Sequence, residues 1–338
     1  MKEVATSPPF KDRFALASLP DGGVLVDLAT GAYSRLNPSG AIVCEALATT
    51  ETVGAAAAIV SARLGITARE AEEAVGHLLE AVNEREPRRD RRDPFRYAAD
   101  AGRGGYVLSS MDVPRLWLSQ DGLTIRSISE QPASEQQTFE YLRAAAPKLL
   151  FLQGAAVLHG AACSGARGLT AFCGDSGAGK TTTARAFGAA GRAVFSEDML
   201  AVASPSPLAV HLGGEDAIRA WAREAAQELL RTSRVEASGL KAALAGTPVP
   251  VSEVWVIAAA HRLEGPGPLA PRRLGATDGT LAVMTGLFLG ATSAPEWRRF
   301  MALAQAIATS TPLYEARMPR GIEALQSAAK DYTQNSAS

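Results

Sequence analysis

The sequence has few of the features that mark secreted, metal-stapled or membrane-spanning chains. It contains only three cysteines in 338 residues, Cys44, Cys163 and Cys173, and their odd number and wide spacing exclude a disulfide framework or a cysteine metal clip. We expect them to be small buried hydrophobic residues in a reducing compartment. No apolar run reaches the ~18 residues that a membrane helix needs, and the opening MKEVATSPPFKDRF lacks the apolar core of a signal peptide. The sequence therefore predicts a cytoplasmic protein with no membrane partner.

An excess of charge of one sign is also missing. The chain has 34 lysines and arginines against 35 aspartates and glutamates, a formal net charge of −1. This balance gives no bulk attraction to nucleic acid, which is therefore not an expected partner. Hydrophobic residues make up 47% of the chain, enough for sizeable cores, and global disorder is excluded. The length suggests two domains, or one large domain with an attachment.

The first 86 residues predict a small winged-helix-like α+β domain. Hydrophobic alternation and helical periodicity predict a β-hairpin followed by three helices, at 23–28, 33–36, 38–47, 52–64 and from 67 onward. Asn37-Pro38 supplies an N-cap residue and a first-turn proline for the first helix. Thr67-Ala68-Arg69-Glu70 forms a capping box at the start of the third helix.

A charged and then glycine-rich stretch at 87–105 predicts a linker, and a second, α/β domain is expected over 106–330, with a disordered tail at 331–338. Within this domain the pattern predicts strands at 105–109, 115–118, 155–163, 168–173, 193–195 and 253–259. It predicts helices at 135–150, 182–190, 295–309 and 319–329.

The most specific motif is FCGDSGAGKTTTARAF at 172–187, because Gly174 to Thr181 satisfies the phosphate-binding pattern G-x-x-x-x-G-K-[ST]. Glycines allow backbone amides to turn toward an anion, and the following helix adds the positive end of its dipole. We predict an ATP site, with Lys180 at the outer phosphates and the Thr181 hydroxyl on Mg²⁺. Its residues are Gly174, Asp175, Ser176, Gly177, Ala178, Gly179, Lys180, Thr181 and Thr182. A flexible glycine turn with a solvated lysine is the structural alternative.

A magnesium–nucleotide site also needs carboxylates. Glu197 and Asp198 follow the predicted strand at 193–195, where a parallel sheet presents residues to its ligand-binding edge. One can hold the metal, and the other can orient or deprotonate an attacking hydroxyl. The alternative is that both cap a turn. Taken alone, His159 fits a satisfied core residue, and Arg219 fits either a brace for a phosphoryl group or a surface arginine packed on Trp221.

The order of these motifs resembles the C-terminal catalytic domain of bacterial HPr kinase/phosphorylase. His159-Gly160, the loop from Gly174 to Thr181, and Glu197-Asp198 match that family's His-Gly, GDSG-x-GKS and acidic pair. The resemblance covers roughly 105–330, although only 158–202 is specific. It implies a P-loop fold related to phosphoenolpyruvate carboxykinase.

The resemblance also implies roles for individual residues. Lys180 and the loop would bind nucleotide phosphates, and Thr181 and Asp198 would hold Mg²⁺. Glu197 would be the base toward the acceptor hydroxyl, with Asp198 supporting the metal or the base. His159 would line the site. The sequence departs from the family in three ways: Glu197 replaces the usual Asp, the later Glu-x-Arg-Gly signature is missing, and so is the family's N-terminal domain.

A different domain stands in that place. Residues 20–86, with VLVDLATGAYSRLNPSGAIVCEAL and LGITAREAEEAVGHLLEAV, resemble the PqqD-like peptide-recognition domain of ribosomal peptide biosynthesis. The resemblance implies that a leader peptide adds as a strand to an exposed sheet edge, beside a groove on the third helix. A DNA-binding winged helix or a plain packing module are the alternatives, and the neutral charge disfavours the first.

Together the two resemblances imply an ATP- and Mg²⁺-dependent serine kinase acting on a ribosomally made precursor peptide, similar to the HPr-kinase-like proteins that act on lasso-peptide precursors. Capture of the leader would raise the concentration of the peptide's tail at the kinase site. A non-catalytic, ATP-switched peptide adaptor is the rival hypothesis, and a kinase of a small molecule or a folded protein is a second. The resembled kinases form hexamers, and the sequence leaves a homo-oligomer open, along with the roles of Arg219, Arg298 and Arg299.

Overall fold

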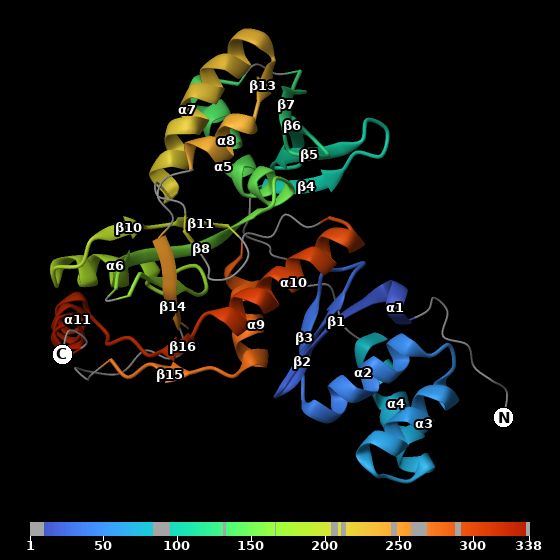
Figure 1. Cartoon of the computed structure of the whole chain (residues 1–338). Coiled ribbons are helices and arrows are strands. Elements are labelled where there is room, and N and C mark those ends of the chain that lie inside the picture. Colours follow the sequence, from blue (N-terminus) through green and yellow to red (C-terminus); the bar gives the residue numbers. More distant parts are fainter. Residues whose placement is uncertain are drawn as a thin grey trace. The chain divides into compact units, whose positions relative to one another are not determined.

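The chain divides into two compact units in the computed structural model (Figure 1). The structure describes residues 10–83, 95–130, 133–165, 167–203, 209–210, 214–244, 249–257, 269–287 and 292–335. Unit 1 comprises 1–91, 275–281 and 293–305, and unit 2 comprises 92–274, 282–292 and 306–338. Two segments of the C-terminal half thus belong to the unit that contains the N-terminal domain, which sequence periodicity did not indicate.

Unit 1 is built on a small antiparallel sheet and a set of helices. Its elements are α1 (Phe10–Arg13), β1 (Phe14–Leu19), β2 (Gly22–Asp27), β3 (Tyr33–Leu36), α2 (Pro38–Thr49), α3 (Val53–Leu64) and α4 (Ala68–Asn83). The Asn37 side chain caps α2 by accepting a hydrogen bond from the Gly40 amide at 2.7 Å, as the Asn-Pro pair predicts. The strand β1 was not predicted, and it turns the expected hairpin into a sheet of order β1-β2-β3.

The central strand β2 is buried on both faces. Leu25 points to the core formed with α2, α3 and α4, while its neighbours Val24 and Val26 point to the opposite face and are fully buried too. The segments 275–281 and 293–305 come from α9 (Ala276–Gly286) and α10 (Ala294–Ser310). Trp297 of α10 packs so closely that a Cβ atom on Gly31 would lie 2.2 Å from its ring.

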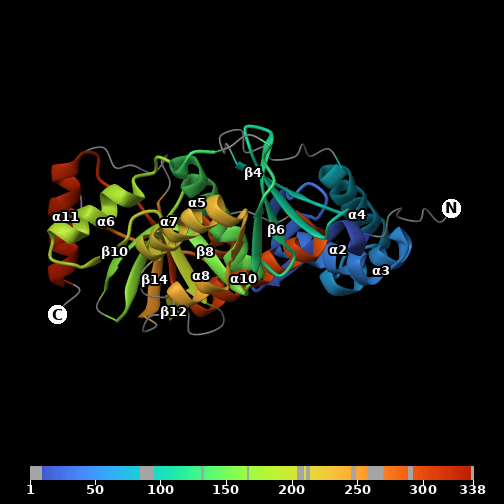
Figure 2. The ribbon, with the colours of Figure 1, turned by 90° about the horizontal axis from the view of Figure 1, so that it is seen from above.

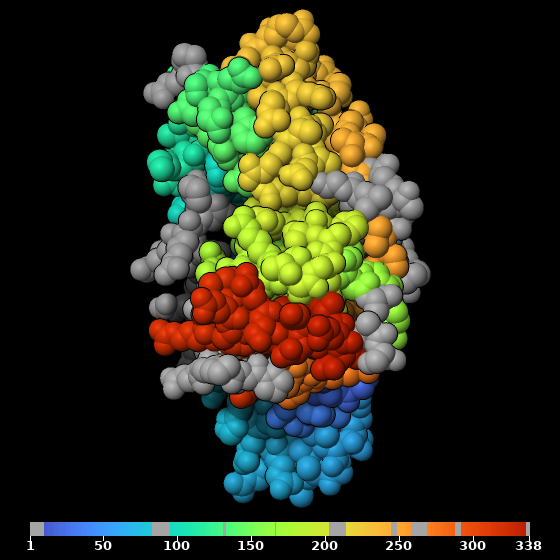
Figure 3. Space-filling model, turned by 90° about the vertical axis from the view of Figure 1, so that its left-hand side faces the viewer, coloured from blue at the N-terminus to red at the C-terminus, as the bar shows by residue number. Residues whose placement is uncertain are grey.

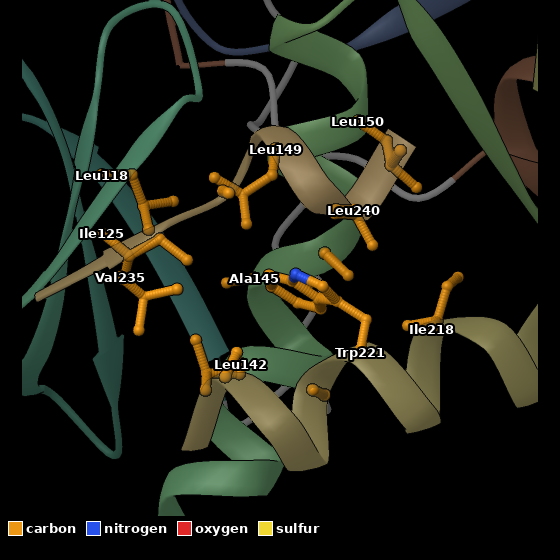
Figure 4. Packing of buried hydrophobic residues seen from close by; sticks show 14 of the residues in the cluster. Leu118, Ile125, Leu142, Ala145, Leu149, Leu150, Ile218, Trp221, Val235 and Leu240 are labelled. Atoms are coloured by element: carbon orange, nitrogen blue, oxygen red, sulfur yellow. The ribbon is translucent and has the colours of Figure 1, made fainter. Parts of the chain in front are cut away.

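Unit 2 contains a five-stranded antiparallel sheet backed by helices. Its order is β13-β7-β6-β5-β4, formed by β4 (Phe95–Ala99), β5 (Gly105–Ser110), β6 (Val113–Ser119), β7 (Thr124–Ser127) and β13 (Arg234–Glu236). It packs on α5 (Glu135–Leu152), α7 (Gly214–Thr232) and α8 (Ser238–Ala243). Figure 4 shows Leu118, Ile125 and Val235 of the sheet pointing toward Leu142 and Leu149 of α5. The predicted linker therefore gives way to strand β4 at Phe95; residues 84–94 lie outside the described part.

The larger sheet of unit 2 is mixed, and it carries the glycine motif. Its strands are β8 (Ala155–Ser164), β9 (Leu169–Cys173), β10 (Val194–Ser196), β11 (Met199–Ala203), β12 (Ala209–Val210), β14 (Val249–Ile257), β15 (Arg272–Arg273) and β16 (Leu313–Ala316). The strand β9 runs antiparallel to β8 and parallel to β14, which runs parallel to β16. The expected mixed α/β architecture is thus confirmed.

An aromatic cluster joins this sheet to two helices, α6 (Lys180–Ala189) and α11 (Ile322–Asn335). Phe172 of β9 stacks on Phe187 of α6, and the Trp255 ring meets both edge-on and contacts Tyr332 of α11 at a centroid distance of 4.9 Å. Figures 2 and 3 show α11 (red) lying beside α6 (yellow-green). Because Tyr332 is held in this cluster, α11 continues to Asn335, through most of the segment predicted as a disordered tail.

Candidate functional site

The glycine motif forms a tight connection between β9 and α6. The backbone of Gly174 has a φ of 143°, and a Cβ atom there would lie 2.0 Å from the Ile257 carbonyl oxygen of the neighbouring strand β14. Gly177 and Gly179 have φ values of 81° and 101°, but a Cβ atom on either would meet nothing within 4 Å. Crowding thus requires a glycine at 174, whereas backbone conformation favours one at 177 and 179. The space beside the last two positions is open.

The first turn of α6 faces this loop without a side-chain cap. Its N-cap residue is Gly179, which offers no side chain to accept a hydrogen bond from the first turn. The amides of a helix's first turn have no partner within the helix, and they carry the positive end of its dipole. Around the loop, Asp175, Ser176, Gly177 and Thr182 are exposed, while Ala178 is buried and its amide donates to the Asp175 carbonyl at 3.1 Å. The geometry fits an anionic ligand such as a phosphate group.

Lys180 is buried beneath the loop, with 7% of its surface exposed. Its Nζ donates hydrogen bonds to the carbonyl oxygens of Gly174, at 2.9 Å, and Asp175, at 3.1 Å. Burial lowers the pKa of the ammonium group, against the opposing effects of Cys173, Asp198 and Asp175. Both hydrogen-bond partners of this desolvated cation are neutral carbonyl oxygens, and neither of them is an ion-pair partner. A phosphate would supply one.

The acidic pair lies next to α6. The Thr181 hydroxyl donates to the Glu197 carbonyl oxygen at 2.9 Å, and Arg185 forks onto the Glu197 carboxylate, with Nε 2.9 Å from Oε1 and Nη2 2.5 Å from Oε2. The pKa of Glu197 is lowered, and the hydrogen bond from Arg185 is the main cause. No role was predicted for Arg185, although its position four residues after Thr181 puts both on one face of the helix.

A break in the sheet ladder positions the pair. The strands β10 and β11 both run antiparallel along β8, pairing Ser196 with Ala162 and Met199 with His159. Glu197 and Asp198 fill the gap between them, where the Gly160 amide donates to the Asp198 carbonyl at 2.9 Å. The predicted parallel edge is therefore wrong: the acidic pair follows an antiparallel strand.

The Asp198 carboxylate has two cationic or ionisable neighbours. Its Oδ1 lies 3.2 Å from His159 Nε2, and its Oδ2 lies 3.5 Å from Nη1 of Arg143 in α5. The hydrogen bond from His159 is the main cause that lowers the pKa of Asp198, with further contributions from the charges of Arg143 and Lys180. Arg143 also bonds Glu140 on its own helix at 3.1 Å. No local signal marks Arg143, which lies 55 residues from Asp198 in the sequence.

The structure thus gathers Lys180, Thr181, Glu197, Asp198 and His159 into one cluster. Thr181 and Asp198, the two predicted metal ligands, are both in it, although the described residues contain no group of three or more His, Cys, Asp or Glu side chains that could bind a metal by themselves. Mg²⁺ keeps several waters and takes ligands from phosphates, so one carboxylate and one hydroxyl suit it.

The other candidate arginines lie in different settings. Arg219 of α7 is paired with Glu215, which raises its pKa, and it also feels the charges of Glu140 and Asp198. Arg298 belongs to unit 1, where Nη2 donates to the Lys11 carbonyl at 2.8 Å.

A second candidate site lies in unit 1, at β3. This strand forms an edge of its sheet in the described part of the chain. The Asp27 amide donates to the Ala32 carbonyl, so alternation of the ladder directs the backbone groups of Tyr33 and Arg35 away from β2. A small pocket beside this strand is lined by Phe14, Leu25, Asp27, Ala32, Ser34 and Val82. A sheet edge next to a pocket suits an extended peptide.

Among the described residues, no helix is both long and apolar enough to cross a bilayer.

Residues 22–86 match the family model of coenzyme PQQ synthesis protein D (PqqD). The predicted PqqD-like domain is therefore confirmed for this segment, which lies wholly within unit 1 and ends before unit 2 begins. No curated protein matches the chain.

Proposed function

We propose that this chain is an ATP- and Mg²⁺-dependent kinase that phosphorylates a serine of a ribosomally made precursor peptide, held through its leader by the PqqD-like domain. One observation carries the kinase part: Lys180 is buried under a glycine loop that is tied, through Thr181, to the acidic pair at 197 and 198. The resemblance of 158–202 to HPr kinase/phosphorylase, which implies a fold related to phosphoenolpyruvate carboxykinase, supports the same proposal. PqqD-like domains bind precursor peptides, and the β3 edge with its pocket supports that role here.

The chain's own residues would divide the work in the following way. Loop amides and the first turn of α6 hold phosphate oxygens, and Lys180 turns from the Gly174 and Asp175 carbonyls toward them. Asp198, kept ionised by His159, holds the cation together with the Thr181 hydroxyl. Bound ATP–magnesium supplies the phosphoryl group. Glu197, once separated from Arg185, would accept the proton of the serine hydroxyl as the serine oxygen bonds to the γ-phosphorus, while the bond between that phosphorus and the bridging oxygen breaks and ADP leaves.

The test is transfer of labelled γ-phosphate from ATP to a serine-containing precursor peptide that the PqqD-like domain binds. Lys180→Ala should abolish transfer and leave peptide binding intact, because unit 1 contains none of the loop. Lys241→Ala is the matched control, since Lys241 is an exposed lysine of α8 and belongs, like Lys180, to unit 2. Equal transfer by wild type and Lys180→Ala would refute the mechanism.

One observation favours a second function, a peptide adaptor that uses ATP binding only as a switch. The Glu197 carboxylate is already engaged by Arg185 and is therefore not poised as a base. Mass spectrometry of the peptide after incubation with ATP separates the two functions: an added phosphate supports the kinase, and an unchanged mass with intact nucleotide binding supports the adaptor.

A further inference from the structure

Helix α9 contributes residues to both units. It has 11 residues, and its first part, up to Leu281, belongs to unit 1, whereas 282–286 belong to unit 2. Each end is fixed by specific contacts inside its own unit. No helix was predicted for this segment.

The first turn of α9 is capped from a distant part of the chain. The Asp21 carboxylate, in the turn between β1 and β2, accepts hydrogen bonds through Oδ1 from the Thr277 amide at 2.9 Å and from its hydroxyl at 2.7 Å. Gly275 permits this approach, because a Cβ atom there would lie 2.1 Å from Asp21 Oδ2. An acidic cap at a helix N-terminus also satisfies the dipole.

The next residue of the same turn binds the candidate peptide edge. Arg35 Nε lies 2.7 Å from Asp278 Oδ1. Arg35 belongs to β3, and its backbone groups point away from β2, toward the position that an added strand would occupy. A peptide strand on β3 would therefore bond to the backbone of the residue whose side chain holds α9.

The last residue of α9 and the residue that follows it contact both approaches to the nucleotide site. A Cβ atom on Gly286 would lie 3.3 Å from the Cys173 side chain, so the backbone of Gly286 lies close to that side chain. Leu287 forms an antiparallel bridge with Leu158. Cys173 directly precedes the glycine loop, and Leu158 directly precedes His159.

We infer that α9 couples peptide capture at β3 to the nucleotide site, with Arg35 and Asp278 as positioning residues at one end and Gly286 and Leu287 as the contacts at the other. The inference rests on the proposed function. A strand bound to β3 fixes Arg35, Arg35 fixes the first turn of α9, and the helix carries this restraint to the residues that precede the loop and His159. Coupling between two binding sites is reciprocal, so nucleotide binding must in turn restrain β3.

This reciprocity allows a test that needs no peptide. The probe is the non-hydrolysable ATP analogue AMP-PNP with magnesium chloride, added to the full chain, and the readout is amide hydrogen exchange. In wild type, the probe should slow exchange at 174–183 and also, by about fivefold or more, at 33–36, since couplings of this kind are typically at least that large. In Asp278→Asn, slowing at 174–183 should remain and slowing at 33–36 should be lost.

Two further variants separate coupling from damage to the fold. Glu73→Gln breaks an exposed ion pair with Arg69 on α4 of the same unit and should leave the wild-type response unchanged. The double variant Arg35→Asp, Asp278→Arg restores a pair with reversed charges and should restore slowing at 33–36.

The outcomes distinguish this inference from the proposed function. Slowing confined to 174–183 in wild type, or slowing at 33–36 that survives in Asp278→Asn, overturns the coupling and leaves the nucleotide site standing. If calorimetry gives no heat of AMP-PNP binding and exchange at 174–183 does not change, both the site and the coupling fall.

Discussion

Lys180→Met should separate nucleotide affinity from fold stability. Methionine nearly matches lysine in length and flexibility but carries no charge, so it can occupy the same buried position. In the native chain, burial lowers the pKa of Lys180, which means that the folded state holds the charged form at a cost. The change removes that cost and leaves the carbonyls of Gly174 and Asp175 without the Nζ donor. Since Asp175 is exposed, water can replace Nζ as the hydrogen-bond donor. We therefore expect the unfolding free energy of Lys180→Met to stay within about 1 kcal/mol of the wild-type value.

Affinity should respond very differently. A lysine–phosphate contact of ~4 Å at an effective dielectric constant of about 20 has a Coulomb energy of ~4 kcal/mol. Because Lys180 is already desolvated in the folded chain, phosphate binding requires little further desolvation of its ammonium group. We therefore expect Lys180→Met to lose roughly 2–3 kcal/mol of binding free energy, which corresponds to a roughly 30- to 150-fold weaker Kd. Calorimetry with AMP-PNP and magnesium measures this directly.

The pH dependence of stability gives an independent check on Lys180. Its folded-state pKa lies below the unfolded value of 10.5, so between these two values the unfolded chain binds a proton that the folded chain has released. Wild type should gain stability as pH rises through that window, and Lys180→Met should lack this contribution. A loss of more than about 2 kcal/mol by the variant at neutral pH, well outside the expected range, would refute the description of Lys180 as a desolvated cation. Binding within threefold of wild type would refute its role at the phosphates.

Three other substitutions test the structure at separate points. Gly174→Ala should cost more than about 3 kcal/mol in denaturant unfolding, because of its clash and positive φ, whereas Gly177→Ala, with open space, should cost about 1 kcal/mol; equal costs would contradict the loop geometry. His159→Ala removes the main cause that lowers the pKa of Asp198, so the acid limb of phosphoryl transfer should move to higher pH, and an unmoved limb would exclude Asp198 from the titration. Asp21→Ala removes the cap of α9 and should cost about 1 kcal/mol at neutral pH. Although burial opposes it, hydrogen bonds from Thr277 lower the pKa of Asp21, so this contribution is present above pH 3.8 and is lost as pH falls through the folded-state value. A difference in unfolding free energy between wild type and Asp21→Ala that stays the same at low pH would contradict this role of Asp21.

Local signals were sufficient where a short stretch determines its own structure. The Asn37-Pro38 pair correctly predicted the start of α2, and the capping box correctly predicted the start of α4, where the Thr67 amide donates to Glu70 at 2.8 Å. The strand β1 was missed although a signal exists: the apolar stretch Phe14–Leu19 is followed by Pro20-Asp21-Gly22, the residues of a tight turn.

The rest depends on contacts that no local pattern encodes. The loop motif and the acidic pair were each recognised from the sequence. The strand before the acidic pair was wrongly predicted to lie in a parallel sheet, because the pairing of β10 and β11 with β8 is set by tertiary packing. Arg143 reaches Asp198 across 55 residues, and Asp21 reaches Thr277 across 256. An isolated arginine or aspartate gives no hint of such a partner.

The composition of unit 1 also decides which experiment can test leader dependence. Deletion of residues 1–90 would remove most of unit 1, including Gly31, which lies against Trp297 of α10, and would uncover that buried tryptophan. Loss of activity after such a deletion would therefore report exposed apolar surface as readily as loss of a peptide site.

A proline in place of Arg35 is the better perturbation of the edge, because it removes an outward-pointing amide while the ladder bonds at Ser34 and Leu36 stay in place. Since it also removes the contact to Asp278, it must be compared with Arg35→Ala, which loses the side chain alone. If the edge binds the leader, the proline variant should weaken peptide binding well beyond the alanine variant; equal binding by the two would place the leader elsewhere.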